Sequence, residues 1–152
     1  MDALQLSNIL KTNLVNTHFL GVFPANRIPS PAKVFIHAPS CMVVNTDVLG
    51  QPGKHWVGVY CEAHDKAVDY FDPFGTAVSI SHHILAYLKH FKHVKMNNKK
   101  IQASYEVSCG PHVVYFLLKR DRGWTHDKIV NTLHKNRYCD IHVKLFTTHL
   151  LV

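Results

Sequence analysis

No stretch of the chain is apolar over the length that a membrane-spanning helix requires. The sequence also lacks a charged-then-apolar beginning of the secretory kind, internal repeats and low-complexity tracts. Its four cysteines lie far apart without a C-x-x-C pair, so their spacing indicates neither disulfides nor a redox motif. These absences argue against a membrane protein, a repeat protein and a disulfide-rich secreted domain. We therefore expect a protein inside a cell or a virus particle, where thiols stay reduced.

Acidic residues are also scarce, since ten Asp and Glu stand against seventeen Lys and Arg. The resulting net charge is +7 with histidine neutral, and thirteen histidines add positive charge below about pH 6.5. This balance favours a polyanion such as nucleic acid as a partner. The length of 152 residues and the hydrophobic content of 47% predict one globular domain, residues 1–152, with a substantial core.

Hydrophobic periodicity predicts an α+β domain. It indicates helices over 2–15, over 79–92, from Cys109 through Leu118, and from a Thr125 cap to about Lys135. It indicates strands over 55–61 and 67–71, joined in an antiparallel hairpin, and a further strand over 100–107. Residues 22–40 are expected to be extended with a short strand over 33–37, and 140–152 fit a helix or a strand. We expect a mixed β-sheet packed on a buried central helix that carries Cys109 at its N-terminus, with Ser108 as its cap.

Four polar residues indicate a catalytic site by their types and their order. His55 enters an apolar run, Asp72 opens the motif Asp-Pro-Phe-Gly, and Gln102 precedes Cys109 by seven residues. A thiol nucleophile needs a base, the base needs an orienting carboxylate, and the developing oxyanion needs a donor. All these parts are present, which favours a cysteine protease.

The local surroundings of these residues fit that chemistry. A cysteine in the first turn of a helix lies at the positive end of the helix dipole, which lowers the pKa of its thiol. His55 and Asp72 belong to successive strands of the hairpin, so antiparallel pairing can bring them to one rim of the sheet. We expect Gly110 and Trp56 to border the bound substrate. Gly110 leaves room beside the sulfur, and Trp56 either shields the ion pair from water or packs in the core.

In this order, His55-Trp56, Asp72-Pro73-Phe74-Gly75, Gln102 and Ser108-Cys109-Gly110 resemble the adenovirus endopeptidase (adenain) family of cysteine proteases. The resemblance continues upstream through Phe19-Leu20-Gly21 and Cys41-Met42-Val43-Val44-Asn45-Thr46, and it spans residues 19–118. It implies an adenain-like fold with His55 as base, Asp72 as its orienter, Gln102 as oxyanion donor and Cys109 as nucleophile. Asp72 departs from the adenovirus enzymes, which usually have glutamate there, although related proteases of ubiquitin-like modifiers use aspartate.

The resemblance also implies substrates and activators. Family substrates are viral precursor proteins cut at small, glycine-containing sites, so we expect cleavage of virion proteins, in the host nucleus and the virion, by a monomer without a metal or small-molecule cofactor. Adenovirus enzymes are stimulated by a peptide that adds a strand and forms a disulfide with a cysteine eleven residues before the glutamine. Phe91 stands at that spacing here, so we expect any activating peptide to bind without a disulfide. The shorter chain points to a more distant virus or a virus-like mobile element.

DNA is the family's other cofactor, and the densest basic segment is a candidate for binding it. This segment holds Lys89, Lys92, Lys95, Lys99 and Lys100. The first three would share one helical face if the helix over 79–92 continued that far. Such contacts would go to phosphates, without readout of bases.

Three other functions stay open. A protease for a ubiquitin-like modifier would use the same four residues and would cleave modifier conjugates in preference to short peptides. An acetyltransferase would use a similar Cys-His-acid set and require acetyl-coenzyme A, although the Asp-Pro-Phe-Gly motif argues against it. A zinc-binding nucleic-acid module would use two C-x-x-H pairs, Cys109 with His112 and Cys139 with His142, since zinc takes tetrahedral Cys and His sets.

Overall fold

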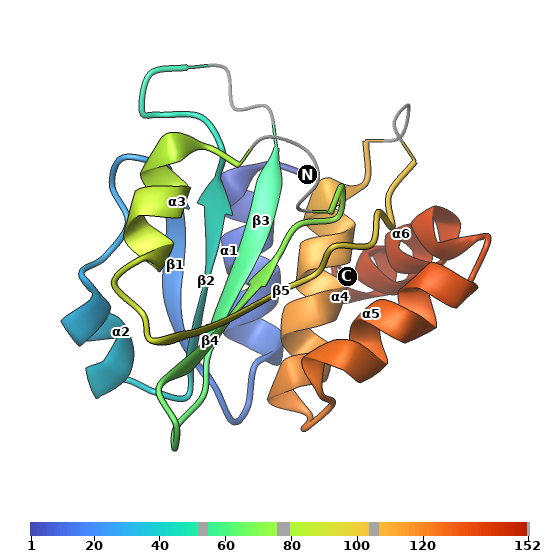
Figure 1. Ribbon diagram of the computed structural model, residues 1–152. Coiled ribbons are helices and arrows are strands. Elements are labelled where there is room, and N and C mark those ends of the chain that lie inside the picture. The colour runs from blue at the N-terminus through green and yellow to red at the C-terminus, as the bar shows by residue number, and fades with distance from the viewer. Residues whose placement is uncertain (52–54, 76–79, 104–106, 152) are drawn as a thin grey trace.

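The computed structural model describes residues 1–51, 55–75, 80–103 and 107–151, and its middle layer is a five-stranded mixed sheet (Figure 1). The strands are β1 (His18–Pro24), β2 (Ser40–Asn45), β3 (Trp56–Cys61), β4 (Ala67–Phe71) and β5 (His93–Met96). They follow one another across the sheet in chain order. The inner pairings, β2 with β3 and β3 with β4, are antiparallel, whereas the outer pairings, β1 with β2 and β4 with β5, are parallel.

Helices cover both faces of the sheet (Figure 1). They are α1 (Ala3–Asn13), α2 (Pro31–Ile36), α3 (His82–Leu88), α4 (Cys109–Asp121), α5 (His126–Lys135) and α6 (Cys139–Leu150). Alternate residues of β2 point to opposite sides: Cys41 and Val43 pack with α1, α4, α5 and α6, whereas Met42 and Val44 pack with α2 and α3. The sheet therefore has a hydrophobic core on each face. No described helix is both long and apolar enough to cross a lipid bilayer.

The central helix of the first core is α4, in which every residue except Lys119 is buried. It approaches the middle of the sheet at Gly58, where an added Cβ would lie 3.2 Å from Cγ1 of Val113. One turn further along the helix, the ring of Phe116 stacks on that of Phe71 at 4.4 Å. Because glycine allows this close approach, α4 is fixed against β3, and its first residue, Cys109, is fixed with it.

The predicted fold class is confirmed, since a mixed sheet packs on a central helix that begins at Cys109. The hairpin of β3 and β4 and the helix capped by Thr125 lie where the sequence predicts them. The tail, for which helix and strand were both open, forms α6. Its buried side chains, Cys139, Val143 and Thr147, recur every four residues, which is the spacing of one helical face.

Several local predictions are wrong. The strand over 33–37 is instead α2, whose first turn is favoured by Pro31 and by the Ser30 hydroxyl, which accepts from the N–H of Lys33. The helix over 79–92 is limited to α3. Residues 100–103 and 107 form no strand, while 104–106 lie outside the described residues, and the fifth strand is β5 instead. Ser108 is the N-cap residue of α4 as predicted, but its side chain makes no capping hydrogen bond, and its hydroxyl donates to Asp140.

Strands β1 and β2 were likewise not indicated by the sequence. Every residue of β2 is buried, so the strand shows no alternation of apolar and polar residues. In β1 the pairing shifts register between Phe19 and Gly21, which interrupts the regular spacing.

Candidate active site

His55 lies between Asp72 and Cys109 at the point where β3 begins. Its Nε2 lies 2.6 Å from Oδ1 of Asp72, and both side chains are buried. The carbonyl of His55 accepts the N–H of Thr46 at 2.9 Å, which extends the pairing of β2 with β3 by one residue and fixes the His55 backbone. The predicted meeting of His55 and Asp72 at one rim of the sheet is therefore what the geometry shows.

Cys109, the first residue of α4, lies beside the His55 ring, on the side away from Asp72. Nδ1 of His55 has no hydrogen bond of ordinary length and angle, yet the ring and the thiol are close enough for each to shift the pKa of the other. Because Asp72 occupies Nε2, Nδ1 is the nitrogen left for the sulfur. A loose contact of this kind is common in a catalytic site without substrate.

The electrostatics of the pair favour a proton on His55. Burial alone would lower the pKa of His55, but hydrogen bonds and charge from Asp72 and Cys109 outweigh burial and raise the pKa to about 9. Burial would raise the pKa of the Cys109 thiol, but His55 and the backbone groups of Trp56 and Gly110 bring it below its usual value. Both shifts favour a thiolate beside an imidazolium.

The motif Asp-Pro-Phe-Gly holds the carboxylate of Asp72 in place. Its Oδ1 also accepts the backbone N–H of Phe74 at 2.9 Å, which closes a tight turn. The ring of Phe74 stacks on the His55 imidazole with a centroid distance of 4.5 Å and an interplanar angle of 20°. This turn therefore contacts His55 twice: the Asp72 carboxylate binds Nε2, and the Phe74 ring covers one face of the imidazole.

Asn97, which the sequence analysis missed, holds the backbone of Asp72. Its Oδ1 accepts the N–H of Asp72 at 2.9 Å, and its Nδ2 donates to the carbonyl of Asp72 at 2.6 Å. Asn97 follows the last residue of β5 and is 2% exposed. An asparagine in a polar stretch of sequence gives no sign of such burial, because only the pairing of β5 with β4 brings it beside Asp72.

Gln102 lies beside the same turn. The backbone N–H groups of Ile101 and Gln102 both donate to the carbonyl of Pro73, at 2.9 and 2.8 Å. The side chain of Gln102 is buried. The structure therefore brings Gln102 next to the turn that carries Asp72, on a segment fixed through its backbone.

A comparison with protein families identifies the group to which this arrangement belongs. The model of the adenovirus endoprotease family matches residues 19–135, a range that includes His55, Asp72, Gln102 and Cys109. The chain belongs to the adenovirus endoprotease family. Its members are peptidases, and no curated protein sequence matches this chain directly.

Solved structures share the fold of this family member at low sequence identity. Two structures of a protease from African swine fever virus (ASFV) superpose with a TM-score of 0.68 at 17% and 18% identity, and they cover 99% and 98% of this chain and 67% and 66% of theirs. The central domain of the uncharacterized Lpg1148 protein from Legionella pneumophila superposes with a TM-score of 0.61 at 16% identity, over 99% of this chain and 95% of that one.

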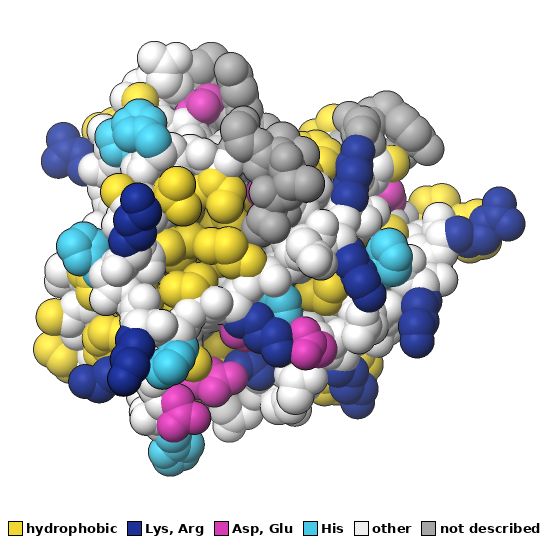
Figure 2. Space-filling view, in the orientation of Figure 1, with side chains coloured by type: hydrophobic (Ala, Val, Ile, Leu, Met, Phe, Trp, Pro, Cys, Tyr) yellow, Lys and Arg dark blue, Asp and Glu magenta, His cyan; other side chains and the backbone are white. Residues whose placement is uncertain are grey.

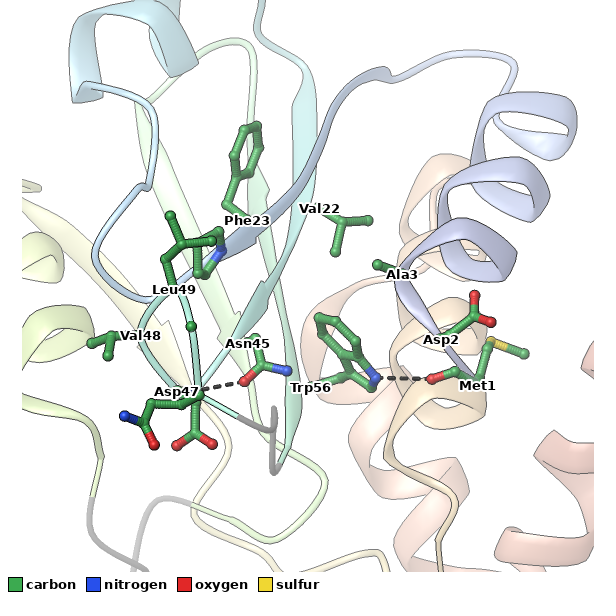
Figure 3. Close-up of a pocket in the computed structure, with 13 residues that line it drawn as sticks. Met1, Asp2, Ala3, Val22, Phe23, Asn45, Asp47, Val48, Leu49 and Trp56 are labelled. Carbon is green, nitrogen blue, oxygen red and sulfur yellow. Dashed lines mark hydrogen bonds between the residues drawn. The ribbon is translucent and has the colours of Figure 1, made fainter.

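Trp56 and Gly110, which were expected to border the substrate, both lie against Met1. The indole Nε1 of Trp56 donates to the carbonyl oxygen of Met1 at 3.0 Å (Figure 3). A Cβ added to Gly110 would lie 3.0 Å from Cβ of Met1, so the space beside Gly110 is occupied by this residue. Trp56 also packs against the core and lines a cavity of about 460 Å³ between the start of α1, the end of β1 and the segment after β2.

The basic segment does not form the predicted helical face. Because α3 ends at Leu88, the residues Lys89, Lys92 and Lys95 do not lie on one helix, and this prediction is wrong. Lys95 forms an ion pair with Asp127 at 2.7 Å. All five lysines, including Lys99 and Lys100, are exposed. Lys and Arg side chains are scattered over the face shown in Figure 2 and do not gather into one patch there.

The C-x-x-H pairs of the zinc hypothesis are separated in the fold. Cys109 lies against His55, and His142 packs edge-on against Tyr115. Instead, one residue of each pair, His112 and Cys139, comes together with Asp140, and their potential ligand atoms lie within 4.8 Å of one another. His112 Nε2 is 2.9 Å from Oδ1 of Asp140, and the Cys139 thiol donates to the carbonyl of Ile101 at 3.5 Å. These groups are therefore already hydrogen-bonded within the protein.

The last residue of the motif, Gly75, yields a stability prediction. Its φ is +76°, and an added Cβ would lie 3.1 Å from backbone atoms of Asn98, Lys99 and Lys100. Gly75→Ala is therefore expected to lower the free energy of unfolding by about 2–3 kcal/mol, through backbone strain and displacement of this neighbouring segment. Denaturant unfolding measures the loss.

Gly50→Ala is the matched control for this substitution. Gly50 also has a positive φ, +91°, but an added Cβ there meets nothing within 4 Å. Its substitution isolates the conformational strain, for which we expect about 1 kcal/mol. Equal losses at Gly50 and Gly75 would contradict the close approach at Gly75.

Proposed function

We propose that the chain is a cysteine endopeptidase with Cys109 as its nucleophile and His55 as its base. Asp72 orients His55, and Gln102 donates a hydrogen bond to the oxyanion. The observation that carries the proposal is the His55–Asp72 hydrogen bond at 2.6 Å, together with the opposite pKa shifts of His55 and Cys109. Membership of the adenovirus endoprotease family supports it.

The proposed reaction is acyl transfer through a thioester. The Cys109 thiolate attacks the scissile carbonyl, and the resulting oxyanion accepts hydrogen bonds from the backbone N–H of Cys109 and the side-chain amide of Gln102. The His55 imidazolium gives its proton to the leaving amine as the C–N bond breaks. Neutral His55 then takes a proton from water, whose oxygen attacks the thioester; the C–S bond breaks, which releases the carboxylic acid and restores the Cys109 thiolate beside the His55 imidazolium. Asp72 keeps the imidazole in one tautomer and orientation throughout.

We propose viral precursor proteins as substrates, cut at small, glycine-containing sites during maturation in the host nucleus and the virion. The support is kinship with adenovirus endoproteases and a fold shared with a viral protease. The exposed lysines would let DNA bind through its phosphates, and an activating peptide would bind without a disulfide because buried Phe91 stands at the cysteine's position.

Labelling with a peptide vinyl sulfone that ends in Gly-Gly tests this proposal. We expect a single adduct by intact mass, mapped to Cys109 and absent in Cys109→Ala. The other thiols are internal controls, because burial raises the pKa of Cys41, Cys61 and Cys139 and keeps these thiols protonated. Added duplex DNA is expected to accelerate labelling at low salt and to lose this effect at high salt. Labelling of another cysteine, or of none with DNA and candidate peptides present, would count against the proposal.

Removal of a ubiquitin-like modifier is the second candidate. The observation that favours it is the aspartate at position 72, which fits against His55 at 2.6 Å without the longer glutamate side chain of adenovirus enzymes. The two candidates differ in the substrate that is turned over faster. A higher kcat/KM for a modifier conjugate than for short Gly-Gly peptides would favour deconjugation, and the reverse would favour precursor processing.

The pH dependence of peptide hydrolysis follows from the two pKa shifts. Activity needs the imidazolium, which is lost as the pH rises through about 9, the pKa of His55. It also needs the thiolate, which is lost as the pH falls through the lowered pKa of Cys109. We therefore expect a bell-shaped profile of kcat/KM whose alkaline limb lies near pH 9.

The variant Asp72→Asn assigns the alkaline limb of this profile. It removes the charge that raises the pKa of His55 and leaves the burial that lowers it. The alkaline limb is therefore expected to move to lower pH, which stopped assays at constant ionic strength measure. An alkaline limb that stays near pH 9 in this variant would assign it to a group other than His55.

A further inference from the structure

The carboxylate of Asp140, in the first turn of α6, accepts hydrogen bonds from two segments that flank the site. Its Oδ1 accepts from the Ser108 hydroxyl, and its Oδ2 accepts from the backbone N–H of Ala103 at 3.2 Å. Oδ1 also lies 2.9 Å from Nε2 of His112, one turn along α4. Ser108 directly precedes Cys109, and Ala103 directly follows Gln102. We call these four residues, Ala103, Ser108, His112 and Asp140, the Asp140 cluster.

The cluster completes the fixation of the Gln102 segment. Before Ala103, the N–H groups of Ile101 and Gln102 donate to the carbonyl of Pro73, in the turn that carries Asp72. After Gln102, the N–H of Ala103 donates to Asp140. Gln102 is therefore held between the turn that orients His55 and the helix that contacts Ser108, and its backbone is bonded on both sides.

The protonation states make these bonds strong. Burial would raise the pKa of Asp140, but hydrogen bonds from Ser108, His112 and Ala103 outweigh burial and lower it. Burial lowers the pKa of His112 more than Asp140 raises it. An ionised carboxylate therefore meets three neutral donors, and hydrogen bonds to a charged acceptor are about twice as strong as neutral ones.

We propose that Asp140 is a positioning residue for the oxyanion hole, because its carboxylate fixes the segment that carries Gln102 relative to the residue that precedes Cys109. The inference rests on the proposed function of Gln102 and Cys109. The hydrogen bonds of Asp140 go to Ser108, Ala103 and His112 rather than to His55 or the thiol. Asp140 therefore acts on stabilisation of the oxyanion and leaves the thiolate–imidazolium pair unchanged.

Two reactions of the same thiol separate these effects. Hydrolysis of a Gly-Gly peptide substrate passes through an oxyanion, whereas alkylation of Cys109 by iodoacetamide needs the thiolate but no oxyanion donor. In Asp140→Ala we expect kcat to fall by about 10- to 100-fold, because small displacements of oxyanion donors have effects of this size. The KM, the alkylation rate and its pH dependence are expected to stay within about twofold of wild type.

Variants of Ser108 and of a neighbouring residue complete the design. Ser108→Ala removes one donor and is expected to lower kcat less than Asp140→Ala does. Ser108→Thr keeps the hydroxyl and is expected to retain more activity than Ser108→Ala. Ile141→Ala is the control for truncation on α6, since Ile141 is 58% exposed and should leave both reactions unchanged. Equal losses of hydrolysis and alkylation in Asp140→Ala, or an unchanged kcat, would overturn the proposal.

Hydrogen exchange gives a readout that does not depend on catalysis. Without the carboxylate, the amide proton of Ala103 loses its acceptor and is expected to exchange at least about tenfold faster. If the wild-type protein hydrolyses no peptide, the proposed function fails, and the exchange rate alone decides whether Asp140 holds this segment. An unchanged Ala103 exchange rate would show that it does not.

Discussion

Replacing His55 with alanine is expected to lower kcat/KM for peptide hydrolysis by about four to six orders of magnitude. The substitution removes the base and, with it, the positive charge that favours the Cys109 thiolate at neutral pH. Burial would then dominate at Cys109 and raise the pKa of its thiol. The single substitution therefore removes the base and also reduces the fraction of Cys109 present as the thiolate nucleophile. Steady-state kinetics with a fluorogenic Gly-Gly peptide measure the loss.

The double variant of His55 and Cys109 distinguishes a catalytic unit from two independent contributions. If the two residues act together, His55→Ala combined with Cys109→Ala is no slower than Cys109→Ala alone. His64→Ala is the control, because His64 is an exposed histidine in the turn between β3 and β4 and should leave kcat/KM within about twofold. A His55→Ala enzyme that retains a tenth of wild-type activity would refute His55 as the base.

The pair of His55 and Asp72 could be predicted from sequence because both belong to one hairpin. Runs of β-branched and aromatic residues mark β3 and β4, and the short turn between them leaves antiparallel pairing as the simplest arrangement. Pairing then determines which ends meet, so the residue before β3 and the residue after β4 reach the same rim. Local sequence was sufficient because few residues separate the two strands.

The supporting residues were beyond such reasoning because their partners are distant in the chain. Asn97 meets Asp72 only after β5 joins the edge of the sheet in parallel with β4. Asp140 meets Ala103 and Ser108 only after α6 packs against α4. Parallel pairing and helix packing join segments that no turn connects, and a polar residue in the sequence carries no sign of the partner that will satisfy it.

Ser108 and the lysines show how a correct rule gives a wrong local prediction. Serine before a helix usually caps it with its side chain, but the Ser108 hydroxyl instead donates to the carboxylate of Asp140, a strong charged acceptor. Helical spacing of Lys89, Lys92 and Lys95 assumed that α3 continues, whereas the chain leaves the helix after Leu88 to form β5. In both cases tertiary contacts decide between alternatives that local sequence allows.

A buried ion pair between α4 and the sheet leads to the largest expected effect on stability. Nε of Arg120 lies 2.8 Å from Oδ2 of Asp69 in β4, and their side chains are 8% and 5% exposed. The guanidinium also donates to the carbonyl of Trp124 at 2.7 Å and lies 4.3 Å from the ring centroid of Tyr60. Burial raises the pKa of Asp69 and Arg120 opposes this rise, so the charge of Asp69 depends on its partner.

Arg120→Ala is therefore expected to lower the free energy of unfolding by about 3–5 kcal/mol, because it leaves the carboxylate of Asp69 buried without its partner. The pKa of Asp69 would then lie further above its unfolded value, so the folded state binds a proton that the unfolded state has lost, and the variant gains stability as the pH falls. Urea unfolding at neutral and mildly acidic pH measures both effects.

Two further variants test whether the buried charge is the cause. Adding Asp69→Asn to Arg120→Ala removes the unpaired charge and is expected to recover at least about 1 kcal/mol. Lys95→Ala breaks the ion pair with Asp127, in which the Lys95 and Asp127 side chains are 51% and 65% exposed. This variant should change the free energy of unfolding by less than about 1 kcal/mol. A loss at Arg120 no larger than that at Lys95 would mean that this ion pair adds nothing to the attachment of α4, which would then rest on its other contacts with the sheet and the neighbouring helices.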